Sequence, residues 1–143
     1  MLRSRAREVV LQILYQDDLN PRSNVQISEA FLKKRLNRNQ DLVAFAKTLL
    51  LGTRQQQKEI DGHIAQAAEN WRLERMAVTD RNVLRMGTYE MLHVGTPGRV
   101  VINEAVELAR RFGSKDSAKF VNGILDRILK RSVESSGPSA PKA

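Results

Sequence analysis

Apolar residues recur at three- and four-residue spacing along most of this chain, and no stretch alternates apolar and polar residues as a half-buried strand would. One such stripe consists of Ile102, Ala105, Val106 and Ala109. A stripe of this kind buries one face of a helix and leaves the other in water. The chain has 143 residues, enough for one domain with one core. The pattern therefore predicts an all-α fold: a single compact domain of about six or seven helices.

Residues with known terminal preferences mark the expected helix ends in the first half of the chain. Asn20-Pro21 ends the first helix, because proline cannot continue a helix and disfavours it at the residue before. Ser28 is suited to cap the start of a short second helix. The apolar stripe then predicts one long helix from about Asp41 to about Ala67.

The second half begins with a connection and a further helix. Trp71 and Leu73 lie in the connection and are expected to pack on the core. Thr79 is the expected N-cap of the next helix. Asp80 follows it, where a carboxylate is favoured by the positive end of the helix.

The last predicted helix is followed by a segment of different composition. Ser114 or Asp116 caps the start of this helix. Residues 135–143 are rich in Ser, Pro and Ala and carry too little apolar surface to offset the entropy of ordering them. We therefore expect a folded domain over residues 1–134 and a disordered tail over residues 135–143.

Positive charge is concentrated in two segments. The net charge is +8. Residues 1–40 contain eight Lys and Arg against four acids, residues 110–131 contain seven against two, and residues 41–109 contain eight against nine. If the two basic segments meet in space, they form one positive face of the kind that binds nucleic acid. The alternative is that these charges only solvate helix surfaces.

Several classes of protein are disfavoured by composition. No apolar run approaches the ~20 residues that a membrane-spanning helix needs. The first residues lack the apolar core of a signal peptide. Without cysteine there is no disulfide, no thiolate metal site and no cysteine nucleophile. We expect an intracellular, cytoplasmic protein that does not enter a membrane.

Catalytic groupings are also missing. Glu90 and His93 have the Glu-x-x-His spacing of di-iron bundles, but those sites need two such motifs and two further glutamates. Glu104 and Glu107 lie one turn apart with no histidine or serine on their helix. The sequence predicts no catalytic residues, no metal site and no cofactor, so an enzyme is not expected.

Three arginines near the start are candidates for phosphate binding. Arg3 and Arg7 are four residues apart and align on one face of a helix, whereas Arg5 points elsewhere on the same turn. Together they would form a flexible clamp for phosphates, with no sequence preference of its own. The alternative is a helix that carries solvated arginines.

Two aromatic residues are candidates for contacts with partners. Phe120 lies at the margin of the last apolar stripe, near Lys115 and Lys119, where a half-exposed ring can stack on an RNA base. The alternative is a core phenylalanine. Tyr15 closes the first helix, where it suits either a protein interface or a core position with its hydroxyl in solvent.

Several multi-residue words resemble the NusB family of transcription antitermination factors. They are Arg5-Ala6-Arg7-Glu8, Leu11-Gln12-Ile13-Leu14-Tyr15, Trp71 with Leu73-Glu74-Arg75-Met76, Asp80-Arg81-Asn82-Val83-Leu84-Arg85 followed by Tyr89-Glu90, Ile102-Asn103-Glu104-Ala105-Val106-Glu107-Leu108-Ala109, and Lys119-Phe120-Val121-Asn122-Gly123-Ile124-Leu125-Asp126. They occur in the order of that family, spread over residues 3–130.

This resemblance implies two small helical bundles, no catalysis, and binding of boxA RNA in ribosomal RNA leader transcripts. It implies action together with NusE, a small-subunit ribosomal protein, in an RNA polymerase antitermination complex. The RNA-binding residues carried over from the family are Arg3, Arg5, Arg7, Asp116, Lys119 and Phe120. The NusE-binding residues are Tyr15 and Asp80. Some members of the family form homodimers, so a homodimer is a further expectation.

Two other functions remain open at this point. The same fold occurs as the RNA-binding domain of ribosomal RNA cytosine methyltransferases, which would require a following catalytic domain. A protein-interaction bundle with an incidental basic surface is the other alternative, and it predicts weak RNA binding without sequence preference.

Overall fold

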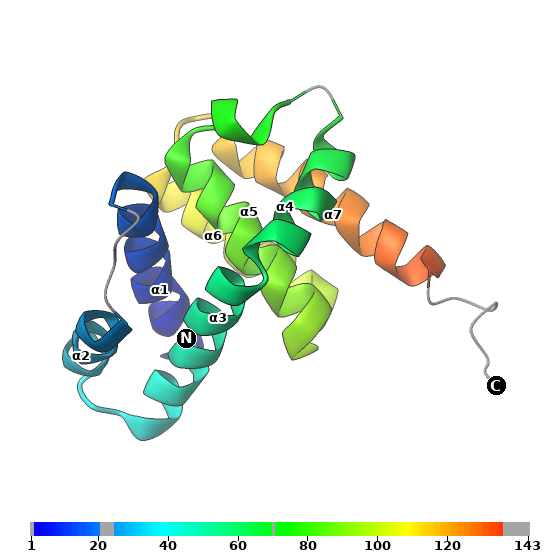
Figure 1. Cartoon of the computed structure of the whole chain (residues 1–143). Coiled ribbons are helices and arrows are strands. Elements are labelled where there is room, and N and C mark those ends of the chain that lie inside the picture. Colours follow the sequence, from blue (N-terminus) through cyan, green and yellow to red (C-terminus); the bar gives the residue numbers. More distant parts are fainter. Residues whose placement is uncertain (1, 21–24, 70, 136–143) are drawn as a thin grey trace, which may run out of the picture.

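The computed structural model describes residues 2–20, 25–69 and 71–135, and within them it contains seven α-helices and no strand (Figure 1). The α-helices are α1 (Leu2–Leu19), α2 (Val25–Arg35), α3 (Gln40–Gln55), α4 (Gln57–Ala68), α5 (Val78–Tyr89), α6 (Gly98–Phe112) and α7 (Ser117–Ser135). A 3₁₀ turn, η1 (Leu73–Arg75), precedes α5, and a π-helical segment, η2 (Glu90–Val94), follows it directly. The predicted all-α class and helix number are confirmed.

The helices form two groups that share α5. Helices α1, α2 and α3 pack on one another, and α4, α6 and α7 gather around α5. Helix α5 also contacts α1 and α3, and it lies in the middle of the molecule in Figure 1. The arrangement matches the expected pair of small bundles and gives them a continuous core.

The predicted apolar stripes are buried. Val9 and Val10 on α1, Ile60 on α4, and Val121 and Leu125 on α7 are all completely or almost completely excluded from solvent. Burial of one such side chain stabilises a fold by roughly 1.5–3 kcal/mol. The core therefore comes from the same residues whose spacing indicated helices.

Some helix boundaries differ from the expected ones. The predicted long helix is interrupted at Gln56, whose φ of −100° and ψ of 18° separate α3 from α4. Thr79 is not the N-cap, because α5 begins at Val78 and its cap position is Ala77. Ser28 is not a cap either: it lies inside α2 and is buried, and its hydroxyl accepts a hydrogen bond from Arg54 at 3.0 Å.

The ends of the chain lie partly outside the described residues. Helix α1 ends at Leu19, where the Asn20-Pro21 signal predicted, although Pro21 itself is not described. Ser135 is the last residue of α7, and residues 136–143 of the expected tail fall outside the described part. None of the described helices combines the length and the apolar character needed to cross a bilayer.

Candidate nucleic-acid interface

The start of α1 presents two arginines to solvent. Arg3 is exposed, and its guanidinium lies 4.3 Å from the centre of the Phe45 ring on α3. Such a cation–π contact orients the side chain without neutralising its charge. Arg5 is half-exposed and donates to Glu8 at 2.9 Å. Both cations are therefore positioned at the surface and accessible to an anion.

Arg7 differs from the other two arginines because it is only 5% exposed. Its Nε donates to Glu90 Oε1 at 2.8 Å, and a second nitrogen donates to the other oxygen of the same carboxylate. Glu104 lies 3.6 Å from the third nitrogen. Burial lowers the pKa of Arg7, but the hydrogen bond and charge of Glu90 outweigh it, so the pKa is raised. The expected flexible clamp of three free arginines is therefore wrong for Arg7, which joins α1 to η2.

A tight turn between α6 and α7 positions the second basic segment. A Cβ on Gly113 would lie 2.4 Å from Ser117 Oγ and 2.7 Å from the Ala109 carbonyl oxygen, so only glycine fits without a shift. The Ser117 hydroxyl accepts a hydrogen bond from the Ser114 amide at 2.9 Å. Helix α7 begins at Ser117, directly after the expected cap position Asp116. The turn fixes where this helix starts.

Three of the predicted RNA-binding residues lie at that helix start. Asp116 and Lys119 are exposed, and Phe120 is partly buried against the core. A lysine side chain attracts phosphate, and the backbone N–H groups at the start of a helix attract it as well. A carboxylate repels phosphate but accepts hydrogen bonds from base amino groups, so Asp116 suits a base rather than the backbone.

Phe120 contacts an aromatic residue from another part of the chain. The ring of Trp71 lies 5.5 Å from that of Phe120, with an angle of 76° between the planes. The expectation that Trp71 packs in the core is wrong, because the residue is 58% exposed; Leu73 is partly buried against the core as expected. An edge-to-face contact of this kind is a favoured aromatic geometry.

Ion pairs connect the two basic segments. Glu8 on α1 accepts from Arg5 and also from Arg111 in the last turn of α6, at 3.2 Å. Ser4 donates to Glu104 of α6 at 2.7 Å. Side chains of α6 therefore reach the first half of α1 at two points, and the final turn of α6 leads into the α6–α7 turn. These contacts connect the segment that carries Arg3 and Arg5 with the segment that carries Lys119 and Phe120.

The two predicted partner-binding residues lie on helices that meet at Asp18. Tyr15, near the end of α1, is 38% exposed, whereas Asp80, in the first turn of α5, is only 8% exposed. Asp80 Oδ1 is buried and has no hydrogen-bond partner among the described residues. Buried polar atoms are nearly always satisfied, so this oxygen is an exception among the described residues.

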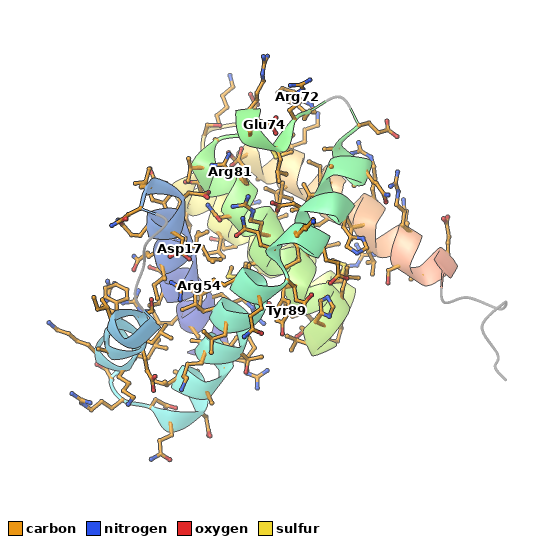
Figure 2. The ribbon with its side chains drawn as sticks, viewed as in Figure 1. Asp17, Arg54, Arg72, Glu74, Arg81 and Tyr89 are labelled. Atoms are coloured by element: carbon orange, nitrogen blue, oxygen red, sulfur yellow. The ribbon has the colours of Figure 1, made fainter. Side chains whose placement is uncertain are left out.

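Asp18 holds α1 against α5. It accepts hydrogen bonds from Asn82 at 2.7 Å, from Arg81 at 3.0 Å and from Arg85 at 3.2 Å. Burial raises the pKa of Asp18, but the Asn82 hydrogen bond and the two guanidinium groups outweigh that effect and lower it. Figure 2 shows Arg81 close to the end of α1 that carries Asp17. Asp17 in turn accepts two hydrogen bonds from Arg54 of α3.

The residues considered for a metal site have structural contacts instead. Glu90 is occupied by Arg7, and His93 lies 3.1 Å from Glu59 and stacks on Tyr89. In the described part of the chain, no three His, Asp or Glu side chains gather so that they could hold a metal ion. The arrangement offers binding surfaces rather than a set of reacting groups.

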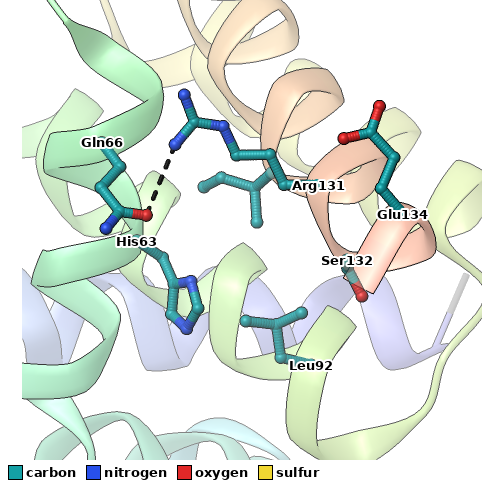
Figure 3. A pocket seen from close by; sticks show the side chains of 7 residues that line it. His63, Gln66, Leu92, Arg131, Ser132 and Glu134 are labelled. Atoms are coloured by element: carbon teal, nitrogen blue, oxygen red, sulfur yellow. Dashed lines mark hydrogen bonds between the residues drawn. The ribbon is translucent and has the colours of Figure 1, made fainter. Parts of the chain in front are cut away.

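A separate groove of about 520 Å³ lies between α4, η2 and the end of α7 (Figure 3). Figure 3 shows the Arg131 side chain reaching Gln66 across it, with a separation of 3.4 Å. The groove is lined by His63, Gln66, Leu92, Ile128, Arg131, Ser132 and Glu134, and none of them is a predicted RNA-binding residue.

Four residues that contribute to these surfaces were not found from the sequence. Trp71 is expected to pack on the core, and no local pattern indicates that its ring is exposed. Glu8 and Arg111 link segments 103 residues apart, which helical periodicity does not reveal. Nothing in the sequence except its charge indicated that Asp18 contacts another helix. Its position two residues before a predicted helix end was the one further indication.

Comparison with known proteins gives a consistent result. The model of the NusB family matches residues 4–130. A transcription antitermination protein NusB of Anaeromyxobacter dehalogenans is 41% identical over 126 residues, which cover 88% of this chain and 89% of that protein. The NusB protein of Thermodesulfovibrio yellowstonii is 39% identical over 143 residues, covering 93% of this chain and 95% of that protein.

Solved structures agree with the sequence relatives. NusB of T. maritima has a TM-score of 0.81 at 38% identity and is matched over 90% of both chains. A crystal structure of the antitermination factors NusB and NusE in complex with double-stranded RNA has a TM-score of 0.77 at 28% identity, covering 91% of this chain and 97% of that one.

Proposed function

The chain belongs to the NusB family, and from that membership we propose that it is an antitermination factor that binds boxA RNA in ribosomal RNA leader transcripts. It acts together with NusE and helps RNA polymerase to resist premature termination. A relative at 28% identity was solved with NusE and double-stranded RNA, which supports NusE and RNA as the two classes of partner. The protein works in the cytoplasm by binding and performs no catalysis.

The observation that carries this proposal is the pairing of cations with an aromatic ring at the start of α7. Lys119 is exposed beside the half-buried Phe120; at the start of α1, Arg3 is exposed and Arg5 is half-exposed. Cations attract phosphates from any sequence, whereas a ring accepts an unpaired base. We propose Arg3, Arg5, Asp116, Lys119 and Phe120 as the RNA-binding residues. Arg7 contributes by holding α1 in place.

NusE binding is assigned to the opposite end of α1. Tyr15 is exposed there, and Asp80 has a buried oxygen that lacks a donor among the described residues. The Asp18 contacts with α5 hold the two helices together, so both residues belong to one surface. A positively charged or amide donor of NusE would pair with the Asp80 carboxylate if that side chain turns outward on binding.

The experiment that tests the function compares a boxA-like RNA with a scrambled RNA of equal length. Fluorescence anisotropy is measured with the full chain, with and without NusE, at near-physiological salt. We expect tighter binding to the boxA-like RNA and a further gain when NusE is present. Equal, salt-sensitive binding to both RNAs, unaffected by NusE, would contradict the proposal and favour a basic surface without sequence preference.

The methyltransferase alternative is less well supported. The two NusB relatives described above are matched over 89% and 95% of their own lengths, so their proteins consist mainly of this domain. The methyltransferase alternative requires a separate catalytic domain in the same protein, so the full-length open reading frame is the observation that tests it.

A further inference from the structure

Trp71 is a large aromatic residue that the fold leaves mostly exposed. It follows α4, its amide donates to the Ala68 carbonyl oxygen, and its side chain is 58% exposed. Its only ring contact among the described residues is with Phe120, which we have proposed to stack on RNA. Aromatic rings bury large apolar areas when another ring packs on them, and much of Trp71 is still uncovered. The uncovered surface of Trp71 therefore lies next to the proposed RNA site.

The angle between the rings limits what can bind. The planes of Trp71 and Phe120 are inclined at 76°, so two bases stacked one on each ring would be nearly perpendicular. Bases in a duplex are parallel, whereas bases of a single strand can be splayed apart and stacked separately. The geometry accordingly favours an unpaired strand that turns sharply between two adjacent nucleotides.

Each ring has a cation beside it in the chain. Arg72 follows Trp71, and its side chain is 74% exposed with a single weak contact to Glu74 at 4.0 Å. Lys119 precedes Phe120 and is exposed. Figure 2 shows Arg72, which directly precedes η1, and Glu74, which lies within η1, at one end of the molecule. A phosphate between two splayed bases would find positive charge on both sides.

We propose that Trp71 is a second base-stacking residue, and that Trp71 and Phe120 hold two successive unpaired bases of the RNA at a corner. This inference rests on the proposed RNA-binding function and adds to it a recognition element for a turned single strand. Arg72 and Lys119 hold the intervening phosphate. Duplex RNA does not fit the corner.

The chain contains one tryptophan, so its fluorescence reports on this position alone. The full chain is titrated with an unpaired boxA-like RNA of about 12 nucleotides, and with the same RNA annealed to its complement. We expect the unpaired strand to quench Trp71 emission. The midpoint of this fluorescence titration should equal the midpoint measured by anisotropy of labelled RNA. The duplex should leave the emission unchanged. Quenching by both RNAs alike would overturn the assignment of an unpaired strand.

Substitutions separate stacking from simple packing. Trp71→Leu keeps an apolar side chain but removes the aromatic face, and we expect the dissociation constant to rise about 5- to 150-fold, the range for losing one stacked base. The dissociation constant of the Trp71→Phe variant should remain within a few fold of the value for the parent chain. Val133→Ala removes exposed apolar surface at the far end of α7 and serves as the matched control, with unchanged affinity.

The outcomes distinguish this inference from the proposed function. If the chain prefers boxA-like RNA and Phe120→Leu weakens binding, but Trp71→Leu binds normally and the emission is not quenched, the inference is wrong and the function stands. If Trp71→Ala weakens binding and Trp71→Leu restores it fully, Trp71 only supports Phe120, and stacking is likewise excluded. If the parent chain shows no RNA preference, the proposed function itself fails.

Discussion

Arg7 on α1 and Glu90 on η2 form a buried ion pair between residues 83 positions apart, with an Nε–Oε1 distance of 2.8 Å. A second hydrogen bond joins the same two groups. Two parallel hydrogen bonds fix the guanidinium plane as well as its position. The pair thereby sets the position of the α1 start, and with it Arg3 and Arg5.

Arg7→Ala should lower the free energy of unfolding by about 3–5 kcal/mol, because it leaves the Glu90 carboxylate buried without its partner. Urea unfolding at neutral pH measures the loss. Arg5→Ala is the matched control: its ion pair with Glu8 is partly exposed, and such pairs contribute at most about 1 kcal/mol. The double variant Arg7→Ala with Glu90→Gln should recover part of the loss. Equal losses for Arg5→Ala and Arg7→Ala would contradict the structural role.

Phe120→Asp should weaken binding of boxA-like RNA by about 1–3 kcal/mol, since the stacked base loses its platform. Phe120 also packs against the core, so a charge there affects folding as well. Phe120→Leu keeps the apolar contact and should lose most of the same binding energy with little change in thermal stability. Anisotropy titrations combined with thermal melts separate the two effects. A folded Phe120→Leu variant with parental affinity would remove Phe120 from the RNA site.

Asp80→Asn should weaken NusE binding at least about tenfold, because a hydrogen bond to a charged group contributes roughly 1.5–3 kcal/mol. The substitution keeps the shape of a side chain that is almost fully buried, which Asp80→Lys would not. Isothermal titration with NusE measures the change. Asp126→Asn on α7, whose carboxylate pairs with Lys130, is the control and should bind NusE normally. Parental affinity of Asp80→Asn would rule out the assignment.

Stability should fall in acid partly through Asp18. The pKa of this carboxyl is lower in the folded chain than its ordinary value of 3.8, so its ionised form is favoured by folding. The contribution is fully present above pH 3.8 and is lost as the pH falls through the lowered folded value. Asp18→Asn should cost about 1–3 kcal/mol at pH 7. It should also flatten the dependence of the urea midpoint on pH below about 4. An unchanged pH dependence would show that Asp18 is not coupled to folding.

Gly113→Ala should disturb the α6–α7 turn, because the new Cβ would collide with a backbone carbonyl oxygen as well as with Ser117. We expect a loss of about 1–3 kcal/mol in stability, typical of overpacking. RNA affinity should fall too, since the turn positions Lys119 and Phe120. Gly123→Ala on α7 is the control, because no atom lies within 4 Å of its added Cβ. Parental behaviour of both variants would show that the turn adjusts freely.

The helical class and the core followed from local spacing. Residues such as Val9, Ile60 and Leu125 repeat at helical intervals, and the resulting faces have no way to leave water except by packing together. Helix boundaries were less predictable. No proline or glycine marks the break at Gln56. Ser28 lies inside α2, where its hydroxyl accepts a hydrogen bond from Arg54 on another helix.

The candidate site was predicted in part, where the local spacing of apolar residues indicated it. Phe120 lay outside the stripe of its own helix, and that local signal correctly placed it at the margin of the core. Arg7 looked like its neighbours Arg3 and Arg5, because sequence shows charge but not the burial that Glu90 compensates. The exposure of Trp71 likewise depends on how α4 meets the start of α7, which no local pattern encodes.

Glu8 pairs with both Arg5 and Arg111, so these ion pairs join residues that are translated early with one that is translated late. Glu8 leaves the ribosome early, yet its second partner is translated 103 residues later, and Phe120 later still. A growing chain thus carries the arginines of α1 for most of its synthesis without the surface that they complete. The proposed RNA-binding surface is therefore completed only after residue 120 has been synthesised, late in the translation of the chain.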